Sequence, residues 1–208
     1  ENMRRFFSSL SKTGIRGIKI DFMDSASQER LDFYDAVAEN LAKNKLMVNF
    51  HGANTPTGEE RSWPHEMSRE GIYGGEQNIW AAIGGQHYCA LPFTRLVSGH
   101  ADFTGGYFGH GPKLRGSSWP LQMAANIIYT SPILHWVSNP ADMEAAFPKG
   151  SPEREVIRNI PSVWEETVVL PPSAIGECAA FARRSGNQWY IALMNGDGRE
   201  RTVSIPLN

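Results

Sequence analysis

The sequence lacks the features that mark a membrane protein or a nucleic-acid-binding protein. No apolar run approaches the roughly 20 residues needed to cross a bilayer, so we expect no membrane span. Lys and Arg total 20 against 22 Asp and Glu, and neither sign forms a long block. This balance argues against the basic stripe of a nucleic-acid-binding surface. What remains is an ordinary globular composition, with 41% apolar residues.

Cysteine is also scarce. The two cysteines, Cys89 and Cys178, could form one disulfide, but two buried free thiols are the favoured interpretation. Neither cysteine lies in a CxxC motif or in a Cys/His cluster. The sequence therefore gives no support for a zinc site built on cysteine.

Aromatic residues and glycine, in contrast, are concentrated between residues 50 and 120, where helical periodicity is weak. Long aromatic and glycine-rich connections inside a compact domain usually carry function. Aromatic faces beside polar groups suit sugar rings, whose C–H faces pack on them. An irregular hydrophobic core explains the same composition equally well, so composition alone does not decide between the two.

The first part of the chain alternates between helix-like and strand-like segments. Apolar spacing predicts helices over 2–13 and 28–43 and strands over 17–23 and 46–51. Ser25 or Ser27 can cap the second helix. Strand, helix and strand with short connections form a βαβ unit with parallel strands, which predicts an α/β fold. We expect a partial (β/α)8 TIM barrel in a longer protein, because a complete barrel needs roughly 250 residues.

The C-terminal part of the chain changes character. We expect a strand-to-loop passage over 87–99, an apolar helix over 118–137 that Pro132 breaks, and a short helix over 153–159. Alternating segments joined by turn residues at 185–187 and 195–198 then indicate hairpins. The predicted domains are residues 1–160, the C-terminal part of the barrel, and residues 161–208, the start of an antiparallel β-domain.

Asp21 is the first candidate for catalysis, because it lies near the end of a predicted strand. In a parallel barrel, catalytic side chains lie at the C-terminal ends of the strands. Lys19 shares its strand face, and a neighbouring ammonium would keep the carboxylate ionised, as a nucleophile requires. The alternatives are a structural ion pair at the sheet end, or Asp24 capping the next helix in its place.

Glu70 and Glu76, in SREGIYGGEQ, are the second group of candidates. The glycines around them allow a close approach of backbone, and two carboxylates on one loop can share a hard cation such as calcium. Solvation on a surface loop is the commoner fate of glutamate. Among the histidines, His51 at the end of the second predicted strand is the best candidate for an active site.

Five segments follow one another in a fixed order. They are GIKIDFMD, LMVNFHGANTPTGEERSWPHEMSREGIYGGEQ, HYCALPFTRLVSGHADFTGG, IRNIPSVWEETVVL and CAAFARRSGNQWYIALMNGDG. Together they resemble glycoside hydrolase family 97 over essentially the whole chain. The resemblance implies a catalytic (β/α)8 barrel, a C-terminal β-domain, cleavage of α-glycosidic bonds, calcium in the active site, and a periplasmic or secreted location.

The resemblance also implies roles for individual residues. Asp21 matches the nucleophile of the retaining, α-galactosidase-like members, and Gly52 stands where the inverting α-glucosidase members carry a glutamate base. By the same match, Glu76 is the acid/base, and Glu70 and Glu76 are calcium ligands. The residues expected to bind substrate are Lys19, His51 and Asp102.

The resulting prediction is a retaining, exo-acting α-glycoside hydrolase, specifically an α-galactosidase, which forms a covalent glycosyl-aspartate intermediate. Its substrate would be an α-linked oligosaccharide or glycoside. One alternative is an inverting α-glucosidase of the same family, against which Gly52 speaks. Another is a non-catalytic carbohydrate-binding fragment.

Overall fold

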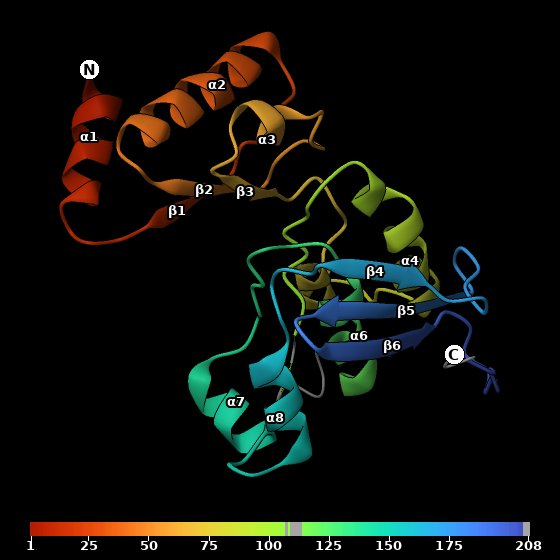
Figure 1. The fold of residues 1–208 in the computed structure, drawn as a ribbon. Coiled ribbons are helices and arrows are strands. Elements are labelled where there is room, and N and C mark those ends of the chain that lie inside the picture. Colours follow the sequence, from red (N-terminus) through yellow and green to blue (C-terminus); the bar gives the residue numbers. More distant parts are fainter. Residues whose placement is uncertain (107, 109–113, 206–208) are drawn as a thin grey trace. The chain divides into compact units, whose positions relative to one another are not determined.

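The computed structural model describes residues 1–106, 108 and 114–205 (Figure 1). Contacts divide the chain into two compact units, which are described separately. The first contains residues 1–72, 98–102 and 131–133, and the second contains residues 73–97, 103–130 and 134–208. Residues 206–208 of the predicted β-domain lie outside the described residues, and the domain boundary at residue 160 stays a prediction.

The first unit is built on a parallel sheet of three strands. Its elements are α1 (Asn2–Ser11), β1 (Gly17–Ile20), α2 (Gln28–Lys43), β2 (Met47–Phe50), α3 (Glu59–Ser62) and β3 (Glu66–Arg69). β2 lies between β1 and β3, and both pairings are parallel. A parallel bridge from Ala101 to Arg69 extends the sheet beyond β3. The predicted βαβ unit is therefore present.

The two faces of this sheet differ in chemistry. Val48 and Phe50 of β2 point to the helices and join a buried core with Phe7, Tyr34, Val37 and Leu41. Asn49 lies on the opposite face, beside its register partner Lys19 in β1. Side chains alternate along a strand, so one face is apolar and packs under α1 and α2. The other face carries polar side chains, and these form the candidate site.

β1 is shorter than the predicted strand. It ends at Ile20 because Phe22 and Asp24 adopt left-handed φ angles of 59° and 46°, which interrupt an extended chain. The side chain of Ser27 then caps α2 by accepting a hydrogen bond from the backbone N–H of Arg30. Ser27, not Asp24, is thus the cap. Asp21 lies in the turn directly after β1.

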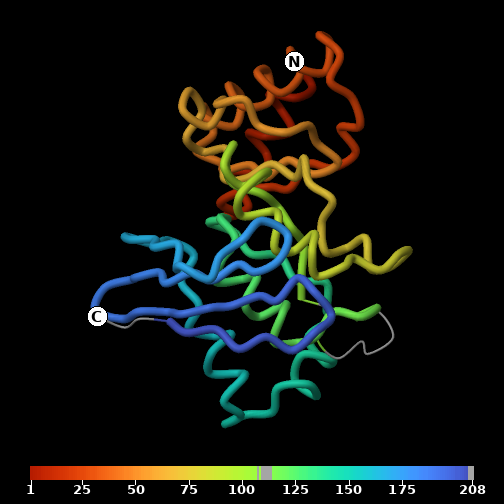
Figure 2. Tube along the Cα trace, turned by 90° about the vertical axis from the view of Figure 1, so that its right-hand side faces the viewer, coloured from red at the N-terminus to blue at the C-terminus, as the bar shows by residue number. Residues whose placement is uncertain are grey.

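The second unit combines short helices with an antiparallel sheet. Its elements are η1 (Gly75–Ile79), α4 (Gly85–Ala90), η2 (Leu91–Phe93), η3 (Arg95–Val97), α6 (Trp119–Ile128), α7 (Pro140–Ala146), α8 (Pro152–Asn159), β4 (Glu166–Val169), β5 (Cys178–Ser185) and β6 (Gln188–Asn195). β5 pairs with both β4 and β6 (Figure 2). Ser185 pairs with Gln188, so the turn holds two residues, and Gly186 supplies the positive φ of 57° that such turns favour.

The expected strand-to-loop passage over 87–99 is wrong, because this segment is helical. α4 reaches Ala90, and two turns of 3-10 helix follow up to Val97. Tyr88 and Cys89, both fully buried, anchor the segment. Short apolar runs fit a strand and a buried helix equally well, so periodicity could not separate the two. Cys89 and Cys178 are both free and buried, as expected.

The helix predicted over 118–137 is also shorter, because α6 ends at Ile128, ahead of Pro132. Arg183 of β5 caps this end: its Nη1 donates to the carbonyl oxygen of Ile127 at 2.9 Å. Its guanidinium also lies over the ring of Trp164, 4.6 Å from the centroid. Burial lowers the pKa of Arg183 to about 10, so it remains a cation at neutral pH. Carbonyl groups at a helix C-terminus favour such a cation.

Candidate active site

Asp102 is the centre of the polar face of the first unit. Its Oδ2 lies 2.7 Å from Nζ of Lys19 and 2.9 Å from Nδ1 of His51. The amide of Asn49 donates to the same oxygen at 2.9 Å. The Asp102 side chain is 0% exposed. A buried carboxylate requires such partners, because transfer out of water without them is costly.

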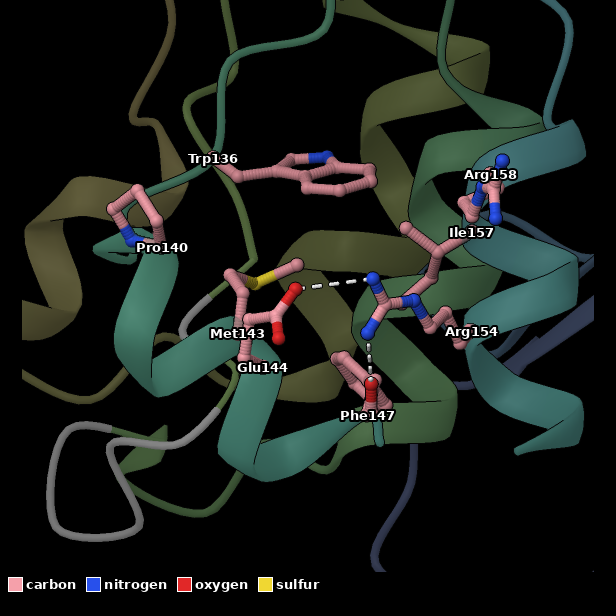
Figure 3. A pocket seen from close by; sticks show the side chains of 8 residues that line it. All are labelled: Trp136, Pro140, Met143, Glu144, Phe147, Arg154, Ile157 and Arg158. Carbon is pink, nitrogen blue, oxygen red and sulfur yellow. Dashed lines mark hydrogen bonds and ion pairs between the residues drawn. The ribbon is translucent and has the colours of Figure 1, made fainter. Parts of the chain in front are cut away.

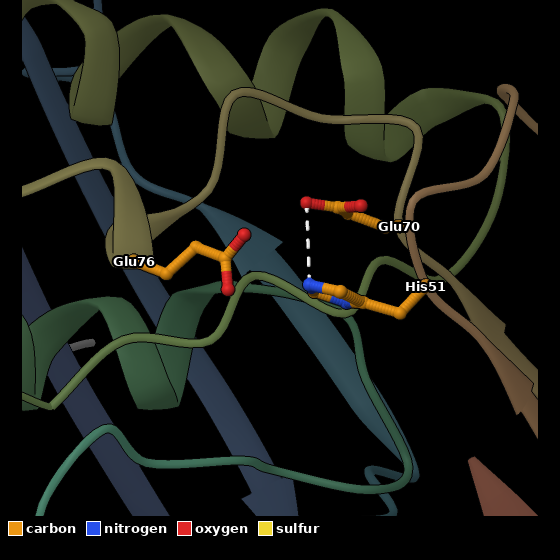
Figure 4. A group of neighbouring side chains, drawn as sticks. All are labelled: His51, Glu70 and Glu76. Atoms are coloured by element: carbon orange, nitrogen blue, oxygen red, sulfur yellow. Dashed lines mark ion pairs between the residues drawn. The ribbon is translucent and has the colours of Figure 1, made fainter. Parts of the chain in front are cut away.

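His51 connects Asp102 with Glu70. Its Nδ1 faces Asp102, and its Nε2 lies 3.5 Å from Oε1 of Glu70 (Figure 4). Burial opposes a charge on the imidazole, but the hydrogen bond to Asp102 and the carboxylate of Glu70 outweigh it and raise the pKa of His51 to about 8. In the absence of a metal ion, His51 is therefore mostly protonated at neutral pH.

Glu70 directly follows β3 and is tied to the end of β2. Its Oε2 accepts a hydrogen bond from the backbone N–H of Gly52 at 2.6 Å. Its own backbone N–H donates to the carbonyl oxygen of Phe50 at 2.8 Å. Side chain and main chain together thus fix the orientation of this carboxylate.

Gly52 and Asp21 share one small space. A Cβ atom at position 52 would lie 2.9 Å from the backbone nitrogen of Phe22 and 3.1 Å from Oδ1 of Asp21. Gly52 also has a φ of 54°, which L side chains rarely adopt. The carbonyl oxygen of Gly52 accepts from the N–H of Asp24 at 2.7 Å, which ties the two turns together. A larger residue at position 52 would therefore displace the turn that carries Asp21.

Lys19 forms its ion pair with Asp102, and the described contacts do not pair it with Asp21. The ion pair of Lys19 is thus with Asp102, and the expectation that Lys19 keeps Asp21 ionised stays a prediction. Asp21 is exposed, and its Oδ1 accepts a hydrogen bond from the backbone N–H of Phe22 at 2.6 Å. Because β1 ends before Asp21, the alternation that would place both side chains on one face no longer applies.

Glu76 belongs to the second unit and lies on η1. The two residues before it, Gly74 and Gly75, allow close packing. A Cβ atom at Gly74 would lie 2.7 Å from the carbonyl oxygen of Phe103, and one at Gly75 would lie 2.8 Å from Cα of Gly105. The N–H of Gly75 donates to the carbonyl oxygen of Phe103 at 2.6 Å. These glycines do serve a close approach of backbone, as the sequence indicated.

His51 and Glu70, which lie side by side in the first unit, and Glu76 of the second unit carry side chains of the types that serve as metal ligands (Figure 4). Two carboxylates are the oxygen donors that calcium prefers, whereas a histidine nitrogen also suits transition metals. The sequence indicated Glu70 and Glu76 as ligands but placed His51 with the substrate. The position of His51 at a strand end carried no signal for metal binding.

Two family models match the chain. The model described as "Glycoside hydrolase 97" matches residues 1–72, and the model described as "Glycosyl-hydrolase 97 C-terminal, oligomerisation" matches residues 163–208. The chain belongs to glycoside hydrolase family 97. The catalytic-domain match contains Asp21, His51 and Gly52.

Two curated relatives of this family 97 chain carry an activity in their names. "Probable retaining alpha-galactosidase" of Streptomyces bingchenggensis is 35% identical over 207 residues, which are 100% of this chain and 31% of that protein. "Retaining alpha-galactosidase" of Bacteroides thetaiotaomicron is 31% identical over 206 residues, which are 92% of this chain and 30% of that protein. The family 97 chain thus spans about a third of the length of these relatives.

A solved structure supports the fold. "Crystal structure of beta-arabinopyranosidase" superposes with a TM-score of 0.80 at 26% identity, and the match covers 92% of this chain and 32% of that chain. The predicted fold class, a partial parallel barrel followed by an antiparallel β-domain, is confirmed. None of the helices in the described part of the family 97 chain is long and apolar enough to cross a membrane.

A hollow within the second unit contains none of the predicted site residues. It has a volume of about 240 Å³ and is lined by Trp136, Pro140, Met143, Glu144, Phe147, Arg154, Ile157 and Arg158 (Figure 3). Arg154 pairs with Glu144 at 3.0 Å and donates to the carbonyl oxygen of Phe147 at 3.1 Å. With a single carboxylate among its lining residues, this hollow lacks the pair that glycoside hydrolysis needs.

Proposed function

We propose that the protein containing this chain is a retaining, exo-acting α-glycoside hydrolase that acts on α-galactosides, with Asp21 as nucleophile and Glu76 as acid/base. The observation that carries this proposal is the shared space of Asp21 and Gly52. An inverting enzyme of the predicted kind needs a glutamate base at position 52, where even a Cβ atom crowds the Asp21 turn. The names of the two curated relatives support the same mechanism.

In the first step, a carboxylate oxygen of Asp21 attacks the anomeric carbon while the bond from that carbon to the leaving oxygen breaks. Glu76 donates its proton to the leaving oxygen, so the aglycone departs as a neutral alcohol. Asp21 is exposed at the C-terminal end of β1, where a substrate can reach it. The product of this step is a glycosyl ester on Asp21.

In the second step, water attacks the same carbon and the ester bond to Asp21 breaks. Glu76, now a carboxylate, takes the proton from the water. Each step inverts the anomeric configuration, so the released sugar retains the configuration of the substrate. Lys19, whose side chain is 33% exposed, can donate a hydrogen bond to a substrate hydroxyl.

We propose calcium as the metal of this site, with Glu70 and Glu76 as its carboxylate ligands. When bound, the ion would supply positive charge that orients both carboxylates and polarises substrate hydroxyl groups. Only six positions separate the two glutamates, so the connecting chain permits both to reach one ion. The Gly52 N–H holds Glu70 in place for that role.

A β-L-arabinopyranoside is the second candidate substrate, because the similar solved structure is described as a beta-arabinopyranosidase. β-L-Arabinopyranose has the ring configuration of α-D-galactopyranose and lacks only the hydroxymethyl group on C5. One site can therefore accept both sugars. Aryl glycosides of the two sugars, compared by kcat/KM in the full-length protein, will rank them.

Proton NMR of the full-length protein turning over an aryl α-galactoside tests the mechanism. We expect the α anomer of galactose to be released first, before mutarotation. Asp21→Gly should abolish turnover, and azide should restore it by taking the place of the carboxylate, which yields β-galactosyl azide. Asp24→Asn, in the same turn, is the matched control and should stay active. First release of the β anomer would contradict retention.

Family membership further supports a periplasmic or secreted location for the whole protein, which we propose. Fractionation of cells that express the full-length reading frame, followed by immunoblotting, tests it. Recovery in the cytoplasmic fraction alone would contradict this location.

A further inference from the structure

We propose that Asp102 is a positioning residue, which fixes Lys19 and His51 for the reaction and does not itself touch the substrate. This inference rests on the proposed function and replaces the substrate-binding role expected of Asp102. It follows from the burial of Asp102, from the number of donors on one of its oxygens, and from the strands that supply those donors.

The burial of Asp102 and the donors around it argue against direct contact with a sugar. Its side chain is 0% exposed, whereas that of Lys19 is 33% exposed. Nitrogen atoms of Lys19, Asn49 and His51 all lie within 2.9 Å of Oδ2. A carbonyl-type oxygen has two lone pairs, so three donors saturate it. A sugar hydroxyl could bind Oδ2 only by displacing one of them.

Lys19 lies in β1, Asn49 lies in β2 and His51 directly follows β2, whereas Asp102 lies on the other side of the sheet, beyond β3. Ala101, the residue before Asp102, forms the parallel bridge to Arg69, which places position 102 next to β3. Lys19 of β1 pairs in register with Asn49 of β2. The carboxylate of Asp102 thus connects three side chains on the polar face, one from β1, one from β2 and one from the residue that follows β2.

Asp102 restricts the ammonium group of Lys19. A lysine has three N–H donors and a flexible four-carbon side chain, which samples several rotamers unless its head group is held. The contact of 2.7 Å with Asp102 occupies one donor of the ammonium group, whose side chain is partly exposed. The remaining donors are then available to a substrate hydroxyl.

Asp102 also restricts the ring of His51. The contact of 2.9 Å between Nδ1 and Asp102 fixes the orientation of the ring, and Nε2 then faces Glu70. Carboxylates that hold a metal-ligating histidine in this way contribute roughly 10- to 100-fold in activity or metal affinity, and we expect an effect of similar size here. Loss of Asp102 should therefore disturb two functional side chains at once.

A double-mutant cycle in the full-length protein tests this role. We expect Asp102→Asn to lower kcat/KM on an aryl α-galactoside by roughly 10- to 100-fold. If Asp102 acts through Lys19, then Lys19→Met should cost much less in the Asp102→Asn background than alone. Effects that multiply would overturn the proposal, and so would an unchanged kcat/KM for Asp102→Asn.

Ser68→Ala is the matched control for this cycle. Ser68 is buried on the same face and pairs in register with Asn49, and its Oγ has no hydrogen-bond partner among the residues that the structure describes. Its removal should leave kcat/KM unchanged. A purely structural role for Asp102 would lower the melting temperature and leave the kcat/KM of the folded fraction unaltered, which also contradicts the proposal.

A crystal structure of the full-length Asp21→Asn protein with a bound α-galactoside gives a test that needs no variant at Asp102. Sugar hydroxyls bonded to Lys19 or His51, and none bonded to Asp102, would support positioning. A direct hydrogen bond from a sugar hydroxyl to Asp102 would overturn it. If the wild-type protein turns out not to hydrolyse α-galactosides, the proposed function fails. In that case the NMR signal of the His51 Nδ1 proton, protected from exchange in wild type and lost in Asp102→Asn, still tests the positioning of the ring.

Discussion

At the scale of single residues, the proposed chemistry depends on the close approach of Gly52 to the turn that carries Asp21. The sequence pointed to Gly52 because a glutamate base is missing there, and the structure adds a steric reason. The space that a side chain at 52 would enter already holds the Phe22 backbone and the Asp21 carboxylate. The proposed retaining mechanism and a glycine at position 52 are therefore linked by packing as well as by family pattern.

Gly52→Ala should impair both stability and catalysis. The strained φ and the contact of 2.9 Å with Phe22 nitrogen should cost on the order of 1–3 kcal/mol, and displacement of Asp21 should lower kcat. Gly186→Ala is the matched control, because Gly186 has a similar φ of 57° but nothing within 4 Å of its added Cβ atom. Urea unfolding and kcat on an aryl α-galactoside measure the two effects. Equal kcat for both variants would show that crowding at position 52 does not reach Asp21.

His51 should make stability depend on pH in the calcium-free protein. Its folded pKa of about 8 exceeds the ordinary value of 6.5, so its contribution is fully present below pH 6.5 and is lost as the pH rises through 8. The contribution is at most about 2 kcal/mol. Urea unfolding in a chelator at pH 6 and pH 9 measures it. His51→Gln should lack this difference; an identical pH dependence in that variant would assign it to other groups.

At the scale of secondary structure elements, local sequence determined some segments and long-range contacts determined others. α2 follows from its apolar spacing and from Ser27, both of which are local signals. The helical structure of segment 87–99 does not follow from local signals, because its apolar run fits a strand as well as a buried helix. The end of α6 likewise depends on Arg183, which is far away in sequence.

Arg183→Met should destabilise the second unit by about 1–2 kcal/mol, because the carbonyl groups at the end of α6 lose their charged donor. Arg184→Met is the matched control: Arg184 is the next residue of β5, and its ion pairs with Glu165 and Glu166 are exposed. That variant should cost less than about 0.5 kcal/mol. Urea midpoints compare the two. A larger loss for Arg184→Met would contradict the capping role.

At the scale of the whole molecule, metal binding should appear as a gain in stability. A ligand that binds only the folded state stabilises it by about 2.7 kcal/mol at one hundred times its Kd. We therefore expect calcium to raise the melting temperature of the full-length protein, a chelator to reverse the rise, and Glu70→Gln to abolish it.

Zinc and magnesium serve as the comparison ions for this measurement. Glu70 and Glu76 favour calcium, whereas His51 could also serve a transition metal. Stabilisation by zinc alone would contradict calcium and would indicate that His51 is a ligand. Glu29→Gln, on the exposed start of α2, should leave the calcium response intact.

The sequence by itself determined the βαβ unit at the start of the chain, the C-terminal hairpin and the presence of Asp21 together with Gly52. These depend on residue spacing, turn residues and motif order, which are properties of neighbouring positions. Only the tertiary structure decided which cation pairs with which carboxylate. Asp102 lies 51 residues from His51 along the chain, and the two meet because parallel strands bring their C-terminal ends to one edge of the sheet. Lys19 thereby pairs with Asp102, and Asp21 is exposed.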